Sequence, residues 1–136
     1  MFFLLALVTG EGTFYSTQPV HAAPAATFTV NHANDVPDVN PGDGRCDGQP
    51  SGGDQCSLRA AVDEPNALAG NDTIILPAGD YTTALPIYVT SNIMLQGAGQ
   101  DQTTITSDNE VGQTVFRVGT NGVMMVTGIR FYSCHR

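Results

Sequence analysis

From Asn71 onward the chain is a series of short β-forming runs, each ended by glycine, asparagine or aspartate. The runs occupy residues 73–76, 85–89, 92–96, 103–106, 114–118, 123–126 and 129–131. Strands this short, separated by turns of varying length, are typical of the successive faces of a solenoid. A β-sandwich is the competing arrangement, but it calls for longer alternating strands and for tight hairpin turns, and only Asn121-Gly122 supplies one. The pattern therefore predicts a mainly β fold built from repeated coils.

The segment before this series combines one strand and one long loop. Residues 26–31 alternate threonine with phenylalanine and valine, as expected of a first strand. Residues 32–55 consist mostly of Asn, Asp, Pro, Gly and Ser, which favour turns. We therefore expect a long loop between the first strand and the next element.

A short helix is predicted at residues 56–64, where the apolar spacing becomes helical. Ser57 can accept a hydrogen bond at the N-cap, and Pro65 is expected to end the helix because proline lacks an N–H and restricts the residue before it. One face of the helix is apolar and consists of Leu58, Ala61 and Val62. A helix this short is unstable alone, so we expect it to lie across the end of a larger structure.

The first residues have the character of an export signal. Residues 1–8 form an almost unbroken apolar run, and small residues follow at 19–24. We interpret residues 1–23 as a signal peptide, cleaved after Ala22, Ala23 or Ala26, with a buried apolar strand as the alternative. No other segment approaches the roughly 20 apolar residues of a membrane span. We therefore expect a secreted or cell-surface protein with no span in the mature chain.

Export would allow disulfides, and Cys46 and Cys56 lie close together across a glycine-rich loop. We predict that they are bonded, with a contribution of about 2 to 3 kcal/mol from the constrained unfolded chain. Cys134 is then left either to pair with a residue beyond the present terminus or to be a free thiol.

The charge balance limits the partners. The chain has five arginines and no lysine against 13 acidic residues, which gives a formal net charge of -8 at pH 7. A negative surface potential disfavours nucleic acids, anionic membranes and polyanionic polysaccharides, the last unless a cation bridges the charges. Neutral glycans or other surface components remain as partners.

Residues 56–62 read CSLRAAV and resemble the motif that names the CSLREA domain, found at the start of secreted and surface β-helix proteins of bacterial type. The flanks agree: a first strand and GDGRCD at 42–47 come before it, and GNDTIILPAGDY at 70–81 comes after it. The later runs NIMLQGAG at 92–99 and VTGIRF at 126–131 resemble the opening coils of pectate-lyase-like, or pectin lyase-like, β-helices.

The resemblance implies a right-handed parallel β-helix in three parts. These are the signal peptide at 1–23, a CSLREA-like cap at 24–70 that carries the motif residues Ser57, Leu58 and Arg59, and the first coils at 71–136, which we expect to be truncated after Arg136. Such a cap has a physical reason, because an open solenoid end exposes unpaired strand edges and an apolar interior.

Two positions depart from the pattern of the family. Ala60 replaces the Glu that would complete a capping box with Ser57, which should cost the helix start about 1 kcal/mol or less. Pro65 replaces an Ala near the end of the helix. Both changes weaken the helix without moving its apolar face.

Oxygen-bearing side chains cluster in the long loop, and such loops bind calcium in many proteins. The candidate ligands are Asp35, Asp38, Asn40, Asp43 and Asp47. The spacing faintly resembles an EF-hand loop, but Pro41 displaces the later ligands and Gln49 stands where a bidentate Glu is needed. Solvated turn residues are the alternative interpretation.

No catalytic residue is predicted in this chain. Arg117 and Arg130 could resemble a lyase base, but no carboxylate cluster lies at coil spacing from either, so we expect both to be outward-facing strand residues. The histidines His21, His32 and His135 are isolated from other chemistry-bearing groups.

The leading functional hypothesis is an exported β-helix module that presents a flat face to glycans or other surface components. The alternative is the N-terminal part of a polysaccharide lyase or glycosidase whose catalytic coils lie beyond this chain.

Overall fold

The computed structural model describes residues 24–50, 53–108 and 114–133. The predicted signal peptide at 1–23, together with Cys134 and His135, lies outside the described residues. The described chain contains strands β1 (Thr27–Thr29), β2 (Asn71–Leu76), β3 (Gly79–Thr83), β4 (Ile87–Val89), β5 (Asn92–Gly97), β6 (Thr103–Ser107), β7 (Phe116–Val118), β8 (Val123–Thr127) and β9 (Arg130–Ser133), and helix α1 (Leu58–Ala67). The fold is thus mainly β, as predicted.

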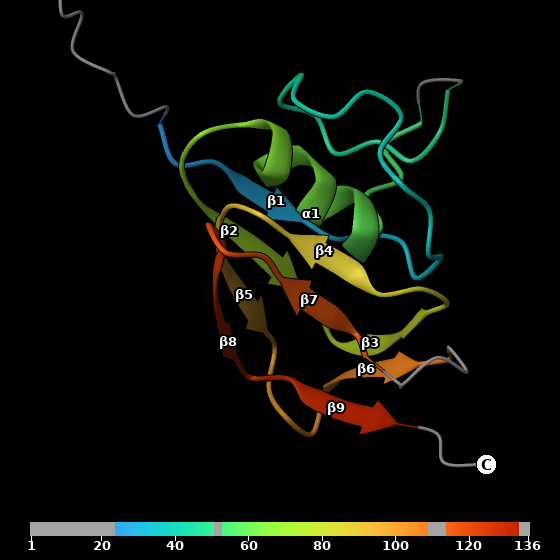
Figure 1. The fold of residues 1–136 in the computed structure, drawn as a ribbon. Coiled ribbons are helices and arrows are strands. Elements are labelled where there is room, and N and C mark those ends of the chain that lie inside the picture. The colour runs from blue at the N-terminus through green and yellow to red at the C-terminus, as the bar shows by residue number, and fades with distance from the viewer. Residues whose placement is uncertain (1–23, 51–52, 109–113, 134–136) are drawn as a thin grey trace, which may run out of the picture.

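The strands form three sheets in which every pairing is parallel. The first sheet has the order β1-β2-β5-β8, the second β3-β6-β9 and the third β4-β7. The chain visits the three sheets in the same order in β2-β3-β4 and in β5-β6-β7, and β8 and β9 begin another round (Figure 1). From β2 onward each parallel neighbour is therefore reached through the other two sheets, whereas β1 and β2 are connected through the long loop and α1.

The register aligns the apolar side chains of successive rounds in columns. In the first sheet Ile74 pairs with Leu95, and Leu95 pairs with Val126. In the second sheet Tyr81 pairs with Ile105. These positions face the interior because side chains alternate between the two faces of a strand, and burial in β2 and β5 follows that alternation. The core is thus a stack of apolar layers between the three sheets.

Most strands lie within two or three residues of their predicted positions, but β3 was not predicted. Its sequence is GDYTT, in which Tyr81 is the only large apolar residue. Pairing with β6 and burial of alternate residues form this strand, and neither contact is local in sequence. Here the pairing with β6 forms a strand although the intrinsic strand propensity of the segment is weak.

The prediction that Pro65 ends the helix is wrong, because α1 continues through Pro65 to Ala67. Pro65 is buried, and Asn66 holds the last turn in place. The Asn66 side chain donates to the carbonyl of Tyr88 (2.7 Å) and accepts from the backbone N–H of Thr90 (2.8 Å). These contacts with the β4 region offset the hydrogen bond that proline cannot donate.

The disulfide predicted between Cys46 and Cys56 is confirmed, with an S–S distance of 2.01 Å. Backbone hydrogen bonds also order the loop that it closes, from Gly48 N to Gln55 O (2.9 Å) and from Val39 N to Asp47 O (2.9 Å). The disulfide and these hydrogen bonds therefore order the loop, although none of its described residues belongs to a strand.

Glycines allow two rounds to approach closely at the corner between the first and second sheets. A Cβ atom on Gly97 would lie 2.2 Å from the carbonyl oxygen of Gly128, which is too close for any side chain. Gly128 itself has φ +67°, and its carbonyl accepts a hydrogen bond from Gly99 N (3.0 Å). Close stacking at this corner thus requires glycine at both positions, Gly97 and Gly128.

Candidate functional site

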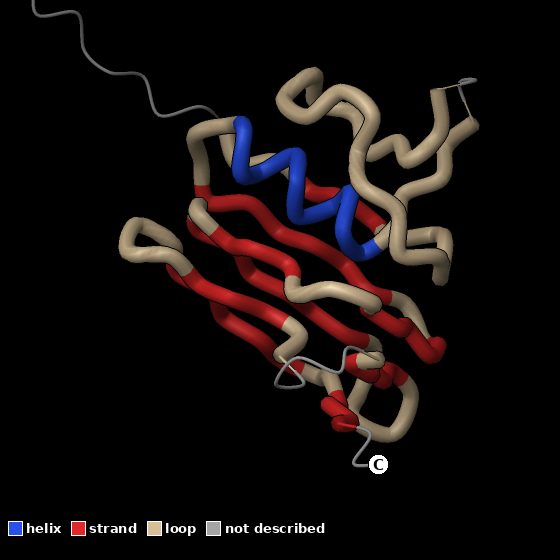
Figure 2. Tube along the Cα trace, turned by 45° about the vertical axis from the view of Figure 1, so that its right-hand side comes forward, coloured by secondary structure: helices blue, strands red, loops and turns tan. Residues whose placement is uncertain are grey.

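Helix α1 covers one end of the stack of sheets (Figure 2). It packs against β2, β4 and β5. Its apolar face is buried as predicted and consists of Leu58, Ala61 and Val62. Ser57 is the N-cap, as predicted: its Oγ accepts from Ala60 N (3.0 Å) and donates to the carbonyl of Val36 (2.5 Å). The helix and the loop therefore close this end together.

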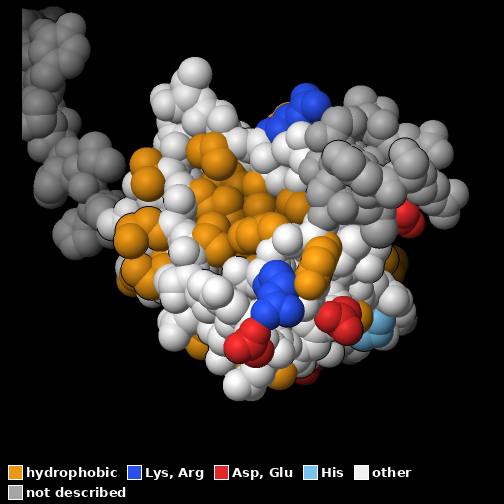
Figure 3. Space-filling view, turned by 90° about the horizontal axis from the view of Figure 1, so that it is seen from below, with side chains coloured by type: hydrophobic (Ala, Val, Ile, Leu, Met, Phe, Trp, Pro, Cys, Tyr) orange, Lys and Arg blue, Asp and Glu red, His pale blue; other side chains and the backbone are white. Residues whose placement is uncertain are grey.

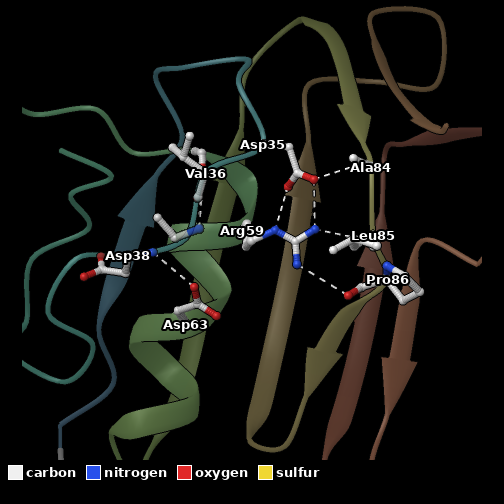
Figure 4. A network of polar contacts seen from close by, with 10 residues as sticks. Asp35, Val36, Asp38, Arg59, Asp63, Ala84, Leu85 and Pro86 are labelled. Carbon is white, nitrogen blue, oxygen red and sulfur yellow. Dashed lines mark hydrogen bonds and ion pairs between the residues drawn. The ribbon is translucent and has the colours of Figure 1, made fainter. Parts of the chain in front are cut away.

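An arginine network joins the cap to the sheets (Figure 4). Arg59 donates from Nε and Nη2 to the two carboxylate oxygens of Asp35, at 2.7 and 2.9 Å. Its Nη2 also donates to the carbonyl of Leu85 (2.7 Å). Asp35 in turn accepts from the backbone N–H of Ala84 (2.8 Å). The pair is mostly shielded, with side-chain exposures of 16% for Arg59 and 13% for Asp35. The network thus ties loop, helix and the turn after β3 together.

A second carboxylate, Glu64, is fully buried between α1 and the loop. Its oxygens accept from Gly42 N and Gly44 N, each at 2.9 Å. Burial raises the pKa of Glu64 above its usual 4.5, and these two hydrogen bonds only partly oppose that rise. Both glycines have positive φ, +97° and +83°, which turns their N–H groups toward the carboxylate. Glu64 therefore fixes the conformation of the loop.

A third carboxylate, Asp63, lies on the same helix and contacts the loop as well. It accepts from Asp38 N at 3.1 Å. Burial raises the pKa of Asp63, while the Asp38 hydrogen bond and the nearby Arg59 charge oppose the rise. Acidic side chains on α1 thus serve as acceptors for loop N–H groups.

The predicted calcium ligands are only partly brought together. Four of them line a hollow of about 140 Å³, namely Asp38, Asn40, Asp43 and Asp47. Asp35 is instead paired with Arg59. The carboxylates of the hollow accept from backbone N–H groups of their own loop, for example Asp38 from Asn40 N (2.7 Å) and Asp47 N (2.9 Å). In the described ranges no group of three or more His, Cys, Asp or Glu residues is arranged to hold a metal ion. Calcium binding stays a prediction.

The arginines considered as lyase bases are both exposed strand residues, as predicted. Arg117 lies over the ring of Tyr88, 6.0 Å from its centroid, on the outer face of the β4-β7 sheet. Arg130 pairs with Asp101 at the surface. His32 accepts a hydrogen bond from Asn34 N (3.2 Å) within the loop.

The outer face of the first sheet carries an open groove of about 290 Å³ across β2, β5 and β8. Its outward-facing lining consists of Asn71, Thr73, Asn92, Met94, Val123 and Met125. The amides of Asn71 and Asn92 form a ladder, with Asn92 Nδ2 donating to Asn71 Oδ1 at 3.0 Å. Each amide has further donor and acceptor capacity beyond this bond. The groove therefore combines amide groups with apolar side chains. Asp72 and Ile93 also line it, but each is only 3% exposed.

Sequence reasoning did not find this groove. Its residues come from three strands that are far apart in the sequence. Some of these residues are polar and others apolar, so together they form no recognisable sequence motif. One signal was available: Asn71 stands two residues before the 73–76 run and Asn92 begins the 92–96 run, and the register of β2 and β5 pairs the two asparagines directly. Aligning the runs on these asparagines would have predicted the ladder.

Comparisons of the chain with known protein families, with curated proteins and with solved structures found no match. In the described ranges no helix is long and apolar enough to cross a membrane. The proposed function therefore rests on the geometry of this chain.

Proposed function

We propose that this chain is an exported cell-surface or extracellular module, the capped first coils of a right-handed parallel β-helix. Three parallel sheets visited in a fixed order support the β-helix. The α1 cap with its Arg59 and Ser57 contacts supports the resemblance to the CSLREA domain. The Cys46–Cys56 disulfide is compatible with an oxidising compartment outside the cell.

The proposed activity is binding of a neutral glycan or another uncharged surface component on the outer face of the first sheet. One observation carries it: the groove across β2, β5 and β8 offers amide groups at Asn71 and Asn92 beside the apolar side chains of Met94 and Met125. Sugar rings present hydroxyl groups at their edges and C–H groups on their faces, so such a lining suits them. A neutral ligand also avoids the repulsion that a net charge of -8 imposes on polyanions.

Affinity electrophoresis through gels that contain neutral or acidic polysaccharides tests this proposal. Retardation by a neutral glycan is expected, and substituting Asn92→Ala together with Met94→Ala should abolish it. The matched control is Gln96→Ala, because Gln96 lies on the same strand, faces outward and does not line the groove. Retardation by no neutral glycan, or equal loss in the control, contradicts the proposal.

An assay for reducing or unsaturated ends should accompany the binding experiment. The proposed module binds glycans without cleaving them. Release of product by the purified chain would instead favour the polysaccharide lyase or glycosidase hypothesis.

A further inference from the structure

Asp72 is a carboxylate at an inward-facing position of β2, whose other inward-facing residues are Ile74 and Leu76. It is 3% exposed, and its register partner on β5, Ile93, is also 3% exposed. Its Oδ1 accepts a hydrogen bond from the backbone N–H of Ala26 at 2.8 Å. Among the described residues no group donates to its buried Oδ2. A buried carboxylate is costly unless a positive charge compensates it, so a cationic donor beside Asp72 would stabilise the fold.

The side-chain cations in the described part of the chain are engaged elsewhere. The sequence contains no lysine. Among the described arginines, three pair with other acids and one lies over an aromatic ring: Arg45 with Asp54, Arg59 with Asp35, Arg130 with Asp101, and Arg117 over Tyr88. In the view from below, an arginine side chain lies directly against an acidic one (Figure 3). The α-ammonium group of a new N-terminus is a further source of positive charge.

The sequence places a processing signal directly before the residue that contacts Asp72. Ala23-Pro24-Ala25 is the only strict A-x-A pattern before β1, and signal peptidases cut after patterns of this kind. Pro24 and Ala25 are exposed, whereas Ala26 is half-buried. A cut after Ala25 would make Ala26 the first residue of the mature chain, and its nitrogen already contacts the buried carboxylate.

We infer that export processing cleaves the chain between Ala25 and Ala26 and that the new α-ammonium group pairs with Asp72. This inference rests on the proposed export of the chain. In the cleavage, the oxygen of a water molecule bonds to the carbonyl carbon of Ala25, which becomes a carboxylate. The nitrogen of Ala26 is released as an amine, which takes up a proton and is kept charged by the adjacent carboxylate. One of its N–H groups keeps the bond to Oδ1, and another donates to Oδ2.

Other cuts would not supply this charge. The sequence alone also allowed cuts that start the chain at Ala23, Pro24 or Thr27. The first two starts keep Ala26 inside the chain, so its nitrogen remains a neutral amide with a single N–H. The third removes Ala26 and with it the hydrogen bond to Asp72. The contact that distinguishes these cuts exists only in the fold, so the sequence could not select among them.

The first test cleaves the full chain in vitro. A four-residue recognition sequence for a specific protease replaces residues 22–25, so that the cut makes Ala26 the first residue. Urea denaturation should show that cleavage lowers the unfolding equilibrium constant at least roughly 10-fold, because a buried ion pair replaces a bond from a neutral amide. In Asp72→Asn the cut should have no such effect, since asparagine keeps an acceptor for the Ala26 nitrogen but carries no charge.

The matched control is Asp80→Asn. It removes the same charge from an exposed position of β3, so cleavage should stabilise this variant as much as the wild-type chain. Cleavage that stabilises Asp72→Asn as much as the wild type, or that leaves the wild type unchanged, would overturn the pairing.

The second test is the intact mass and N-terminal sequence of the full chain after export from a bacterial host. A product that begins at Ala26 is expected. An exported product that begins at another residue overturns the inference and leaves the proposed function standing, whereas a chain that is not exported contradicts the proposed function as well. A product that begins at Ala26 but binds no neutral glycan would contradict the proposed function alone.

Discussion

The two ends of the stack have similar inward-facing residues, but the solvent exposure of these residues differs between the ends. At the α1 end the inward-facing residues Phe28 and Ile74 are buried, with exposures of 6% and 0%. At the other end the equivalent Val126 is 41% exposed. Because Phe28, Ile74, Leu95 and Val126 lie in one column of the register, the burial of Phe28 depends on α1 and the loop, which cover that end. A parallel stack of this kind is thus not closed by its own repeats and needs a separate element at each end.

The cap is held by polar contacts as much as by apolar ones. Leu58 and Val62 fill the end of the interior, but Arg59, Glu64 and Asn66 fix the helix and loop in position. Polar groups this well shielded are costly to leave without partners, so removal of one should reveal how strongly the end is closed.

Substituting Arg59→Ala should have the largest effect. It leaves Asp35 shielded and without its bidentate partner, which should lower the free energy of unfolding by about 3 kcal/mol. Arg130→Ala is the control, because the Arg130–Asp101 pair is exposed (43% and 92%) and should contribute under about 1 kcal/mol. Urea denaturation of both variants measures the difference. Equal effects would mean that the cap network does not stabilise the fold.

Replacing both Cys46 and Cys56 with serine should lower the free energy of unfolding by about 2 to 3 kcal/mol, because the open chain gains conformational freedom when unfolded. The loop and α1 should loosen while the β8 and β9 end stays unchanged. Limited proteolysis should therefore cut the serine variant first between residues 39 and 55. First cleavage in β8 or β9 would contradict the assignment of the disulfide to the cap.

Substituting Gly97→Ala tests the repeat between the two ends. The new methyl group would meet the carbonyl of Gly128, so we expect a loss of about 1 to 3 kcal/mol from overpacking. Gly119→Ala is the matched control, because its Cβ would be 3.6 Å from its nearest contact, Val89 O, which is an ordinary distance. Thermal unfolding of the two variants should differ accordingly. A neutral Gly97→Ala would show that the corners do not stack as closely as described.

The smallest effect concerns pH. Burial raises the pKa of Glu64 above 4.5, so the folded chain binds this proton more tightly than the unfolded chain. The stability that this group contributes is therefore full below pH 4.5 and is lost as the pH rises through its raised pKa. Glu64→Gln removes the titration. The unfolding free energy of the wild-type chain minus that of the variant should fall as the pH rises from acid to neutral, as measured by urea denaturation at each pH. A difference that rises with pH would contradict the direction.

Local sequence signals predicted most strands, the N-cap at Ser57 and the apolar face of α1, because turn residues and periodicity act within a few residues of each position. They failed where contacts between residues far apart in the sequence determine the structure. β3 depends on pairing with β6, and the helix passes Pro65 because Asn66 bonds to the β4 region.

The candidate sites show the same division. Cys46 and Cys56 are close in sequence and were paired correctly, whereas Asp35 was assigned to a calcium loop although its partner, Arg59, lies on the helix. The Asn71–Asn92 ladder depends on the register between two coils, which no local pattern encodes.

Hydrogen exchange of individual backbone amides measures how firmly α1 and the loop close one end of the stack. We expect slow exchange in β2 and β5, which are paired on both sides beneath the cap, and much faster exchange in β8 and β9 at the other end. Exchange in β8 and β9 as slow as in β2, or fast exchange throughout α1 and β2, would contradict a stack that is closed at one end and open at the other.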